Sequence, residues 1–265
     1  MSALAYPELP AAARPSWPAW MAPAAFFSAF GATIAAGFPL LPVALLTEAG
    51  DAVAGIALLV LILVQDAALV GLAVFFAARR IKPQPWHFGL RASRFWVTAG
   101  LALLGGLLIL GFEVGIIELF NTDKHEDELA SNNIIGAIAV GLAVIVVAPV
   151  TEELFFRGFF YRALRTRMRV IWAVLIDSAV FAMIHVQYVG SPEIFIVIGG
   201  FAAVACLVYE KTGSIFACIA IHAVFNTVAS LGSFPVVAIV IGAGVLVACV
   251  LVPRRLGPAP SPFPA

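Results

Sequence analysis

Charge is the scarcest property of this 265-residue sequence. Only 11% of its residues are Asp, Glu, Lys or Arg, against about 25% in soluble domains, and 63% are hydrophobic. This deficit excludes an ordinary soluble globular domain. The 15 acidic and 15 basic residues cancel, and there is no basic arm or aromatic stacking platform, so we expect no nucleic acid partner. The composition predicts an integral membrane protein whose first partner is the lipid bilayer.

Cysteine is also sparse. The three cysteines, Cys206, Cys218 and Cys249, are odd in number and lie in apolar runs, which does not fit a disulfide framework. We expect them to be small packing residues. The sequence also lacks an H-E-x-x-H motif, and this absence excludes a zinc protease of the soluble type.

Long apolar runs are abundant, and a helix of about 20 apolar residues crosses a bilayer. We therefore expect an all-α fold, a polytopic integral membrane helical bundle of about eight transmembrane helices. The expected spans are residues 22–46, 52–78, 95–120, 132–156, 170–188, 193–209, 213–231 and 234–252. They make up one membrane domain, 22–252, between a cytoplasmic N-terminal segment, 1–21, and a disordered Pro-rich tail, 253–265.

The connections between these spans alternate in charge. One alternating set holds 13 of the 15 Lys and Arg residues: Arg14, Arg79, Arg80, Lys82, Arg91, Arg94, Arg162, Arg165, Arg167, Arg169, Lys211, Arg254 and Arg255. The other set is mainly acidic, with Glu48, Asp51, Glu193 and the segment 123–128. Because basic loops stay in the cytoplasm, this pattern predicts a multi-pass protein of the cell membrane with both termini cytoplasmic.

Polar side chains interrupt the apolar C-terminal half at a few places: Glu152 and Glu153, Arg157, His185, and the pair His222 and Asn226. A charged side chain at membrane depth costs about 2.5–3.5 kcal/mol on insertion scales, so such a cluster is a functional-site hypothesis. Glu153 and Arg157 are four residues apart and can pair on one helix face. Adjacent helical residues point about 100° apart, which leaves Glu152 free to face a cavity.

The spacing also predicts that these residues meet. The midpoint between Glu152 and His185 falls near Met168, inside the Arg-rich turn, so an antiparallel helix hairpin would bring the two level. His222 and Asn226 are four residues apart and project together. Measured from the basic loops, Glu152 and His222 both lie about 15 Å into the membrane at helical rise.

A carboxylate, two imidazoles and an amide in a dry site allow two kinds of hydrolytic chemistry. The carboxylate can take a proton from water, while a His and an Asn donate hydrogen bonds to a developing oxyanion. Glu152, His185 and His222 could instead bind zinc with one open position. The spacing does not choose between them, so the cofactor is either zinc or none.

The three ordered motifs resemble those of the CAAX prenyl endopeptidases and bacteriocin-processing enzymes, the CPBP or Abi family. These motifs are Glu152-Glu153-x-x-x-Arg157, Phe181-x-x-x-His185 and His222-x-x-x-Asn226. The resemblance covers residues 132–231, the expected catalytic core. It implies an intramembrane endopeptidase, open to the cytoplasmic side, that cleaves a membrane-associated or lipidated protein or peptide in CAAX-type or bacteriocin-type processing.

The resemblance also implies a role for each residue. Glu152 with His185 would activate water, and His222 with Asn226 would stabilise the oxyanion. Glu153 and Arg157 would be the orienting pair. Whether such an enzyme is glutamate-dependent or a metalloprotease stays open, as do the substrate and the oligomeric state.

Two other classes of function stay open beside the peptidase. Intramembrane acids and histidines also build proton-coupled transporters, although this sequence has no inverted repeat and no polar path across the membrane. A catalytically silent membrane scaffold is the second alternative. Of the other buried polar residues, Gln65 and Asp66 are expected to bond a neighbouring helix, and Asp177 is a candidate for orienting His185.

Overall fold

The structure is a computed structural model in which residues 15, 17–40, 52–91, 95–120, 134–185, 188 and 190–256 are described. All regular secondary structure among these residues is helical, which confirms the all-α fold expected from the composition. Most of the N-terminal segment and of the Pro-rich tail lies outside the described residues, so their expected states stay predictions.

The elements follow the apolar runs of the sequence. The α-helices are α1 (Met21–Gly37), α3 (Ala52–Ala78), α4 (Phe95–Phe120), α5 (Ile134–Leu142), α6 (Ala148–Phe155), α7 (Arg162–Arg165), α8 (Val170–Met183), α9 (Pro192–Thr212), α10 (Ile215–Ala229) and α11 (Pro235–Leu251). Short 3₁₀ segments are η2 (Phe38–Leu40), η3 (Pro85–Phe88), η7 (Ser230–Gly232) and η8 (Val252–Arg255). Two segments are π-helical, η4 (Ala143–Val147) and η5 (Phe156–Tyr161).

Within the described residues, six helical stretches are long and apolar enough to cross a membrane. They are Leu59–Ala78, Ala99–Phe120, Ile134–Arg165, Pro192–Thr212, Ile215–Gly232 and Pro235–Arg255. Two further apolar helices, α1 with 17 residues and α8 with 14, are shorter. These six stretches and two shorter helices lie where the eight spans were expected, so the polytopic helical bundle is confirmed.

In two expected spans the α-helix ends within the described residues, before the expected end of the span; residues 41–46, 186 and 187 lie outside the described part of the chain. The span expected at 22–46 leaves the α-helix after Gly37, because Pro39 has no N–H to continue the hydrogen-bond ladder. The span expected at 170–188 ends as α-helix at Met183. In a continuing α-helix, the His185 backbone N–H would donate to the Phe181 carbonyl. Here the His185 ring Nδ1 lies 3.0 Å from that carbonyl instead.

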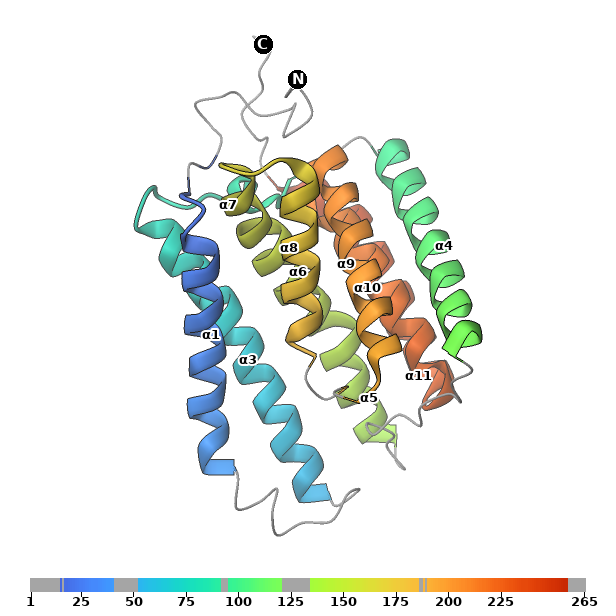
Figure 1. Ribbon diagram of the computed structural model, residues 1–265. Coiled ribbons are helices and arrows are strands. Elements are labelled where there is room, and N and C mark those ends of the chain that lie inside the picture. The colour runs from blue at the N-terminus through green and yellow to red at the C-terminus, as the bar shows by residue number, and fades with distance from the viewer. Residues whose placement is uncertain are drawn as a thin grey trace.

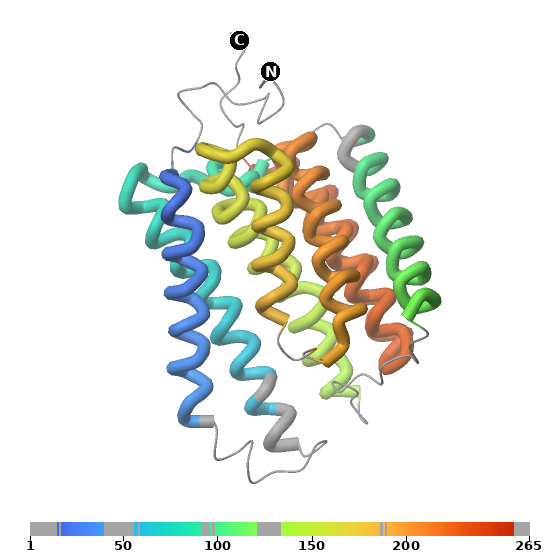
Figure 2. Tube along the Cα trace, viewed as in Figure 1, coloured from blue at the N-terminus to red at the C-terminus, as the bar shows by residue number. Residues whose placement is uncertain are grey.

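The helices form one bundle with roughly aligned axes, shown as a ribbon in Figure 1 and as a tube in Figure 2. α1 and α3 pack together on one side, with α3 also against α6. α10 is the most central element, since it contacts α4, α6, α9 and α11. The helices that carry the predicted polar motifs, α6, α8 and α10, therefore lie within the bundle.

Aromatic side chains fill the interior beside the acidic motif. Phe155, Phe156, Phe159 and Phe160 are all buried, and the Trp17 ring lies 5.0 Å from the Phe159 ring. The outer faces of α4 and α11, by contrast, expose many large aliphatic side chains. Such apolar faces suit a surrounding of lipid hydrocarbon. Helices are stable there because their backbone N–H and C=O groups bond to each other within the helix.

The basic connections meet at one end of the bundle. Arg91 Nε donates to the Gly213 carbonyl at 2.8 Å, and the Ile215 N–H donates to the Gly89 carbonyl at 3.0 Å. The buried Arg162 guanidinium also donates to the His87 carbonyl of the same loop. The loop after α3 thus closes over the ends of α7, α9 and α10. That this end faces the cytoplasm stays a prediction.

Gly213 gives a test of this closure. Its φ of +60° is unfavourable for residues with a Cβ, and a Cβ there would lie 1.8 Å from Arg91 Nη2. We expect Gly213→Ala to lower the melting temperature of the detergent-purified protein by several degrees. Gly232→Ala is the control, because a Cβ at Gly232 meets nothing within 4 Å. Equal melting temperatures of the two variants would contradict the closure.

Cysteine labelling tests the orientation. Arg167 and Gly232 are exposed at opposite ends of the bundle, because three helices, α8, α9 and α10, separate the turn between α7 and α8 from the turn between α10 and α11. In intact cells, an impermeant thiol reagent should label Gly232→Cys and spare Arg167→Cys until the membrane is opened. The unsubstituted protein controls for its native cysteines. The reverse labelling pattern would overturn the cytoplasmic placement.

Candidate active site

The acidic motif lies on one long helical rod, residues 134–165, which α5, η4, α6, η5 and α7 form together. Two parts of the rod are π-helical: η4 directly precedes α6, and η5 contains Arg157. π-turns inserted into α-helices are frequent at functional sites, because they change which side chains share a face. Local backbone geometry therefore marks the same stretch as the charges do.

Asn226 completes the hydrogen bonding of the first π segment. The Ala148 N–H bonds to the Ala143 carbonyl, five residues back. By the same pattern, the Val144 carbonyl would accept a hydrogen bond from the backbone N–H of residue 149. Residue 149 is a proline, which has no N–H. Asn226 Nδ2 on α10 donates to that carbonyl instead, at 2.7 Å. Asn226 thus joins α10 to the rod just before the acidic motif.

The pair expected from the i, i+4 spacing is present. Arg157 Nη1 donates to Glu153 Oε1 at 3.0 Å, and both side chains are fully buried. Arg157 Nη2 donates to the Ala202 carbonyl on α9, also at 3.0 Å. The guanidinium carbon lies 4.6 Å from the Phe181 ring centroid, a cation–π distance. Arg157 therefore ties the rod to α8 and α9.

Asp177 is a second partner for Arg157 that sequence reasoning did not identify. Its Oδ2 lies 3.9 Å from Arg157 Nε and accepts from Cys206 Sγ at 3.1 Å. The expectation that Asp177 orients His185 is not supported by these contacts, which run toward Arg157. One signal was available: Asp177 is the acid of the span that forms the hairpin with the Arg157 helix.

His222 lies between the two glutamates. Its Nδ1 is 3.0 Å from Glu153 Oε1, and its Nε2 is 4.0 Å from Glu152 Oε2. An ionised carboxylate only accepts hydrogen bonds, so Nδ1 carries the proton that is donated to Glu153. Nε2 then points toward Glu152. Glu153 Oε1 is shared between His222 and Arg157, and one carboxylate orients both.

Glu152 is the acid left for chemistry. It is 6% exposed, and its Oε2 has no hydrogen-bond partner among the described residues. The 4.0 Å between this atom and His222 Nε2 exceeds a hydrogen bond. A water molecule about 2.8 Å from each of these two atoms could bridge them by hydrogen bonds. The two adjacent glutamates are thus divided as expected, with Glu153 paired and Glu152 available.

Asp66 adds a third acid near the motif. It is buried on α3, which packs against α6, and it lies beside Thr151, the residue before Glu152. Asp66 was expected to bond a neighbouring helix, but neither of its carboxylate oxygens has a hydrogen-bond partner among the described residues, so that bond stays a prediction. Its closeness to Glu152 could not be read from the sequence, because α3 and α6 are separated by the whole of α4.

His185 reaches the site through Phe181. Its Nδ1 faces the Phe181 carbonyl at 3.0 Å, so this nitrogen donates and Nε2 is left as an acceptor. The Phe181 ring lies 5.2 Å from the His185 ring and 5.9 Å from the His222 ring. Phe181 is thus in ring contact with both histidines. The convergence of Glu152, His185, His222 and Asn226 on one cavity stays a prediction.

The residues suggested as zinc ligands do not form a ligand set. Among the described residues, no three His, Cys, Asp or Glu side chains are grouped closely enough to hold a metal ion. Glu152, His185 and His222 are all among these described residues. His222 already uses Nδ1 on Glu153, and His185 uses Nδ1 on a backbone carbonyl. The described side chains therefore do not fit a bound zinc ion.

Comparison with known proteins adds one finding. Residues 134–228 match the family model described as Rce1-like, type II CAAX prenyl endopeptidase Rce1-like. The matched segment runs from α5 into α10, so it contains both glutamates, Arg157, both histidines and Asn226. Neither a curated protein nor a solved structure matches the chain. This match confirms, over residues 134–228, the resemblance to the CAAX prenyl endopeptidase family that the three motifs predicted.

Proposed function

We propose that this protein is an intramembrane endopeptidase in which Glu152 is the general base. The observation that carries the proposal is the unequal use of two adjacent glutamates. Each glutamate has an unpartnered Oε2, but Glu153 Oε1 is held by both Arg157 and His222, whereas Glu152 Oε2 faces His222 Nε2 at 4.0 Å. A carboxylate in that position can accept a proton from a water bound between the two side chains.

The first step is attack on the scissile carbonyl. Glu152 takes one proton from the water while the water oxygen forms a bond to the carbonyl carbon, and the carbonyl π electrons move onto oxygen. His185 Nε2, left as an acceptor by the bond at Nδ1, can hold the water by its second hydrogen. The nucleophile is thus oriented by two groups from different helices.

His222 is suited to stabilise the oxyanion. When its Nε2 is protonated, the imidazolium is held at Nδ1 by the Glu153 carboxylate, and Nε2 can donate to the new negative charge. Asn226 has two amide hydrogens, of which one is used on the Val144 carbonyl. In the second step the C–N bond breaks, the oxyanion returns to a carbonyl, and the proton on Glu152 passes to the leaving amine.

The substrate we propose is a protein or peptide that is itself associated with the membrane. The reactive groups are buried on helices that are apolar enough to cross a bilayer, so a soluble substrate would have to enter lipid. The family description points to CAAX-type processing of a lipidated chain, and bacteriocin-type processing is the related possibility. The protein would act in the cell membrane, with the basic end of the bundle and both termini in the cytoplasm.

Replacing the proposed base tests the chemistry. We expect Glu152→Gln to lower cleavage by at least about 10²-fold, because general-base catalysis contributes roughly 10²–10⁴-fold and an amide cannot accept the proton. The fold should survive, since Glu152 has no hydrogen-bonded partner at Oε2. Mass spectrometry of membrane peptides from cells with wild-type, variant or no protein measures the cleavage.

Glu113→Gln is the matched control for this substitution, because Glu113 is also an acid in an apolar helix, but lies on α4. Its peptide pattern should equal that of the wild type. If a well-folded Glu152→Gln protein still produces the cleavage products at the wild-type level, the peptidase proposal is wrong. That outcome would favour a silent scaffold.

Removing the buried cation tests the framework. Arg157→Ala leaves Glu153 and Asp177 without their shared partner, and breaking a buried ion pair typically costs about 3–5 kcal/mol. We expect low membrane yield and a lower melting temperature as well as loss of cleavage. Arg167→Ala, at an exposed position of the adjacent turn, is the control. Wild-type yield and melting of Arg157→Ala would show that the pair does not hold the bundle together.

A further inference from the structure

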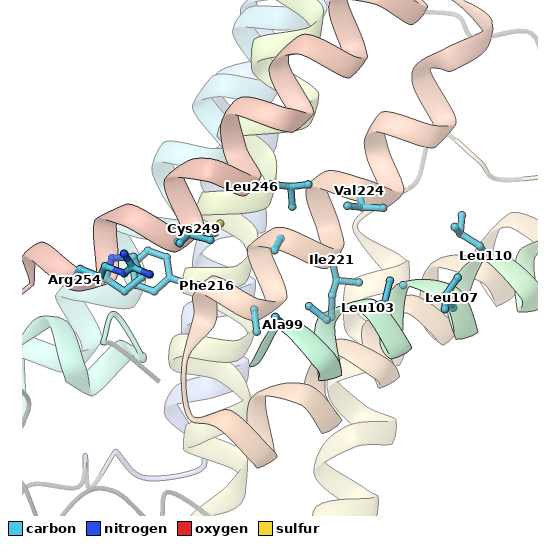
Figure 3. A pocket seen from close by; sticks show the side chains of 16 residues that line it. Ala99, Leu103, Leu107, Leu110, Phe216, Ile221, Val224, Leu246, Cys249 and Arg254 are labelled. Atoms are coloured by element: carbon cyan, nitrogen blue, oxygen red, sulfur yellow. The ribbon is translucent and has the colours of Figure 1, made fainter. Parts of the chain in front are cut away.

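A cleft opens on the side of the bundle away from the acidic motif. α4 and α11 both pack on α10, and between them lies a cavity of about 390 Å³ (Figure 3). Its lining is apolar or small along nearly the whole length, for example Leu103, Leu107 and Leu246. Arg254 is the charged residue of the lining. The cleft thus combines a hydrocarbon wall with a single cation.

The cleft has the length of one leaflet. It starts at the basic end of the bundle, where Ala99, Phe216 and Arg254 line it, and runs inward to Leu110. From Ala99 to Leu110 the rise of α4 is roughly 16 Å, about half of a 30 Å hydrocarbon core. The cation therefore lies at the depth of a lipid headgroup, and the apolar walls lie at the depth of an acyl chain.

The lining indicates the occupant. Its apolar walls suit an acyl chain, and the cation at the basic end of the bundle suits a phosphate headgroup. The depth of the cleft comes partly from Gly106, where an added Cβ would meet nothing within 4 Å. The apolar walls and the single cation together suit a lipid, and a helix of a second copy is the alternative that the mass measurement below distinguishes.

We propose that this cleft binds one acyl chain of an anionic bilayer phospholipid, with the lipid phosphate on Arg254. A guanidinium matches phosphate oxygens by paired hydrogen bonds. Among the described residues no carboxylate pairs with Arg254, so its charge is available to a headgroup. Anionic lipids are concentrated in the cytoplasmic leaflet, to which the basic end of the bundle is assigned.

The bound chain would support the helix that carries two of the proposed site residues. Ile221 lines the cleft, and its neighbour His222, about 100° further round α10, faces Glu153. Val224 also lines the cleft, and the ring of its neighbour Phe225 stacks on Phe201 at 5.2 Å, while the Phe201 ring lies 4.6 Å from His222. A filled cleft thus keeps α10 packed against the rod. This lipid site goes beyond the proposed peptidase function.

Binding can be measured without any substrate. The full chain is equilibrated with nanodiscs of phosphatidylcholine with or without phosphatidylglycerol, and native mass spectrometry counts the lipids retained. We expect one retained phosphatidylglycerol for the wild type and at least a tenfold lower retention for Arg254→Gln. Arg255→Gln is the matched control, because Arg255 is the adjacent cation and does not line the cleft. Equal retention by the two variants would overturn the role of Arg254.

A second pair of variants tests the place of the acyl chain. Gly106→Leu should fill the cleft and abolish retention, whereas Gly111→Leu, on the same helix but outside the lining, should retain the lipid. Retention by Gly106→Leu would show that the chain lies elsewhere. A wild-type dimer that becomes a monomer in Gly106→Leu would show that a second copy occupies the cleft. Because each readout is lipid retention or mass, failure of the peptidase proposal leaves these results unaffected.

Discussion

The bundle depends on one buried cation. Arg157 lies on the central rod with no exposure, surrounded by helices that face lipid, and its charge is balanced by Glu153 on its own helix and Asp177 on α8. A lone charge at this depth would be costly, so α8, α9 and the rod are required to meet where the partners can reach. The Ala202 carbonyl and the Phe181 ring complete the coordination from α9 and α8. The geometry of the proposed site is a consequence of this requirement.

A second constraint comes from the backbone. Unbonded carbonyls are not tolerated in lipid, and Pro149 creates one by removing an N–H. Asn226 satisfies the Val144 carbonyl from another helix, so the residue that breaks the ladder also fixes α10 against the rod. With His222 one turn earlier on α10, the same contact sets the distance between His222 and the glutamates. Structural and chemical demands are therefore met by the same two residues of α10.

The two faces of α10 serve different surroundings. One face turns to the ion pair and the glutamates, and the other borders a cleft open to lipid between α4 and α11. Because α10 contacts four other helices, it connects the cleft side of the bundle with the side that holds the glutamates. A lipid in the cleft would make the bilayer itself part of the support of the site.

The sequence by itself determined the helical membrane fold, the pairing of Glu153 with Arg157 and the freedom of Glu152, because hydropathy and the i, i+4 spacing act within one helix. Only the tertiary structure decided the contacts between helices. Examples are Asp177 beside Arg157, His222 on Glu153, Asn226 on Val144 and the end of α8 before His185. Helix rotation and π-helical shifts set these contacts, and both depend on how distant segments pack. The pattern of residue types within one segment of the sequence does not specify how that segment packs against distant ones.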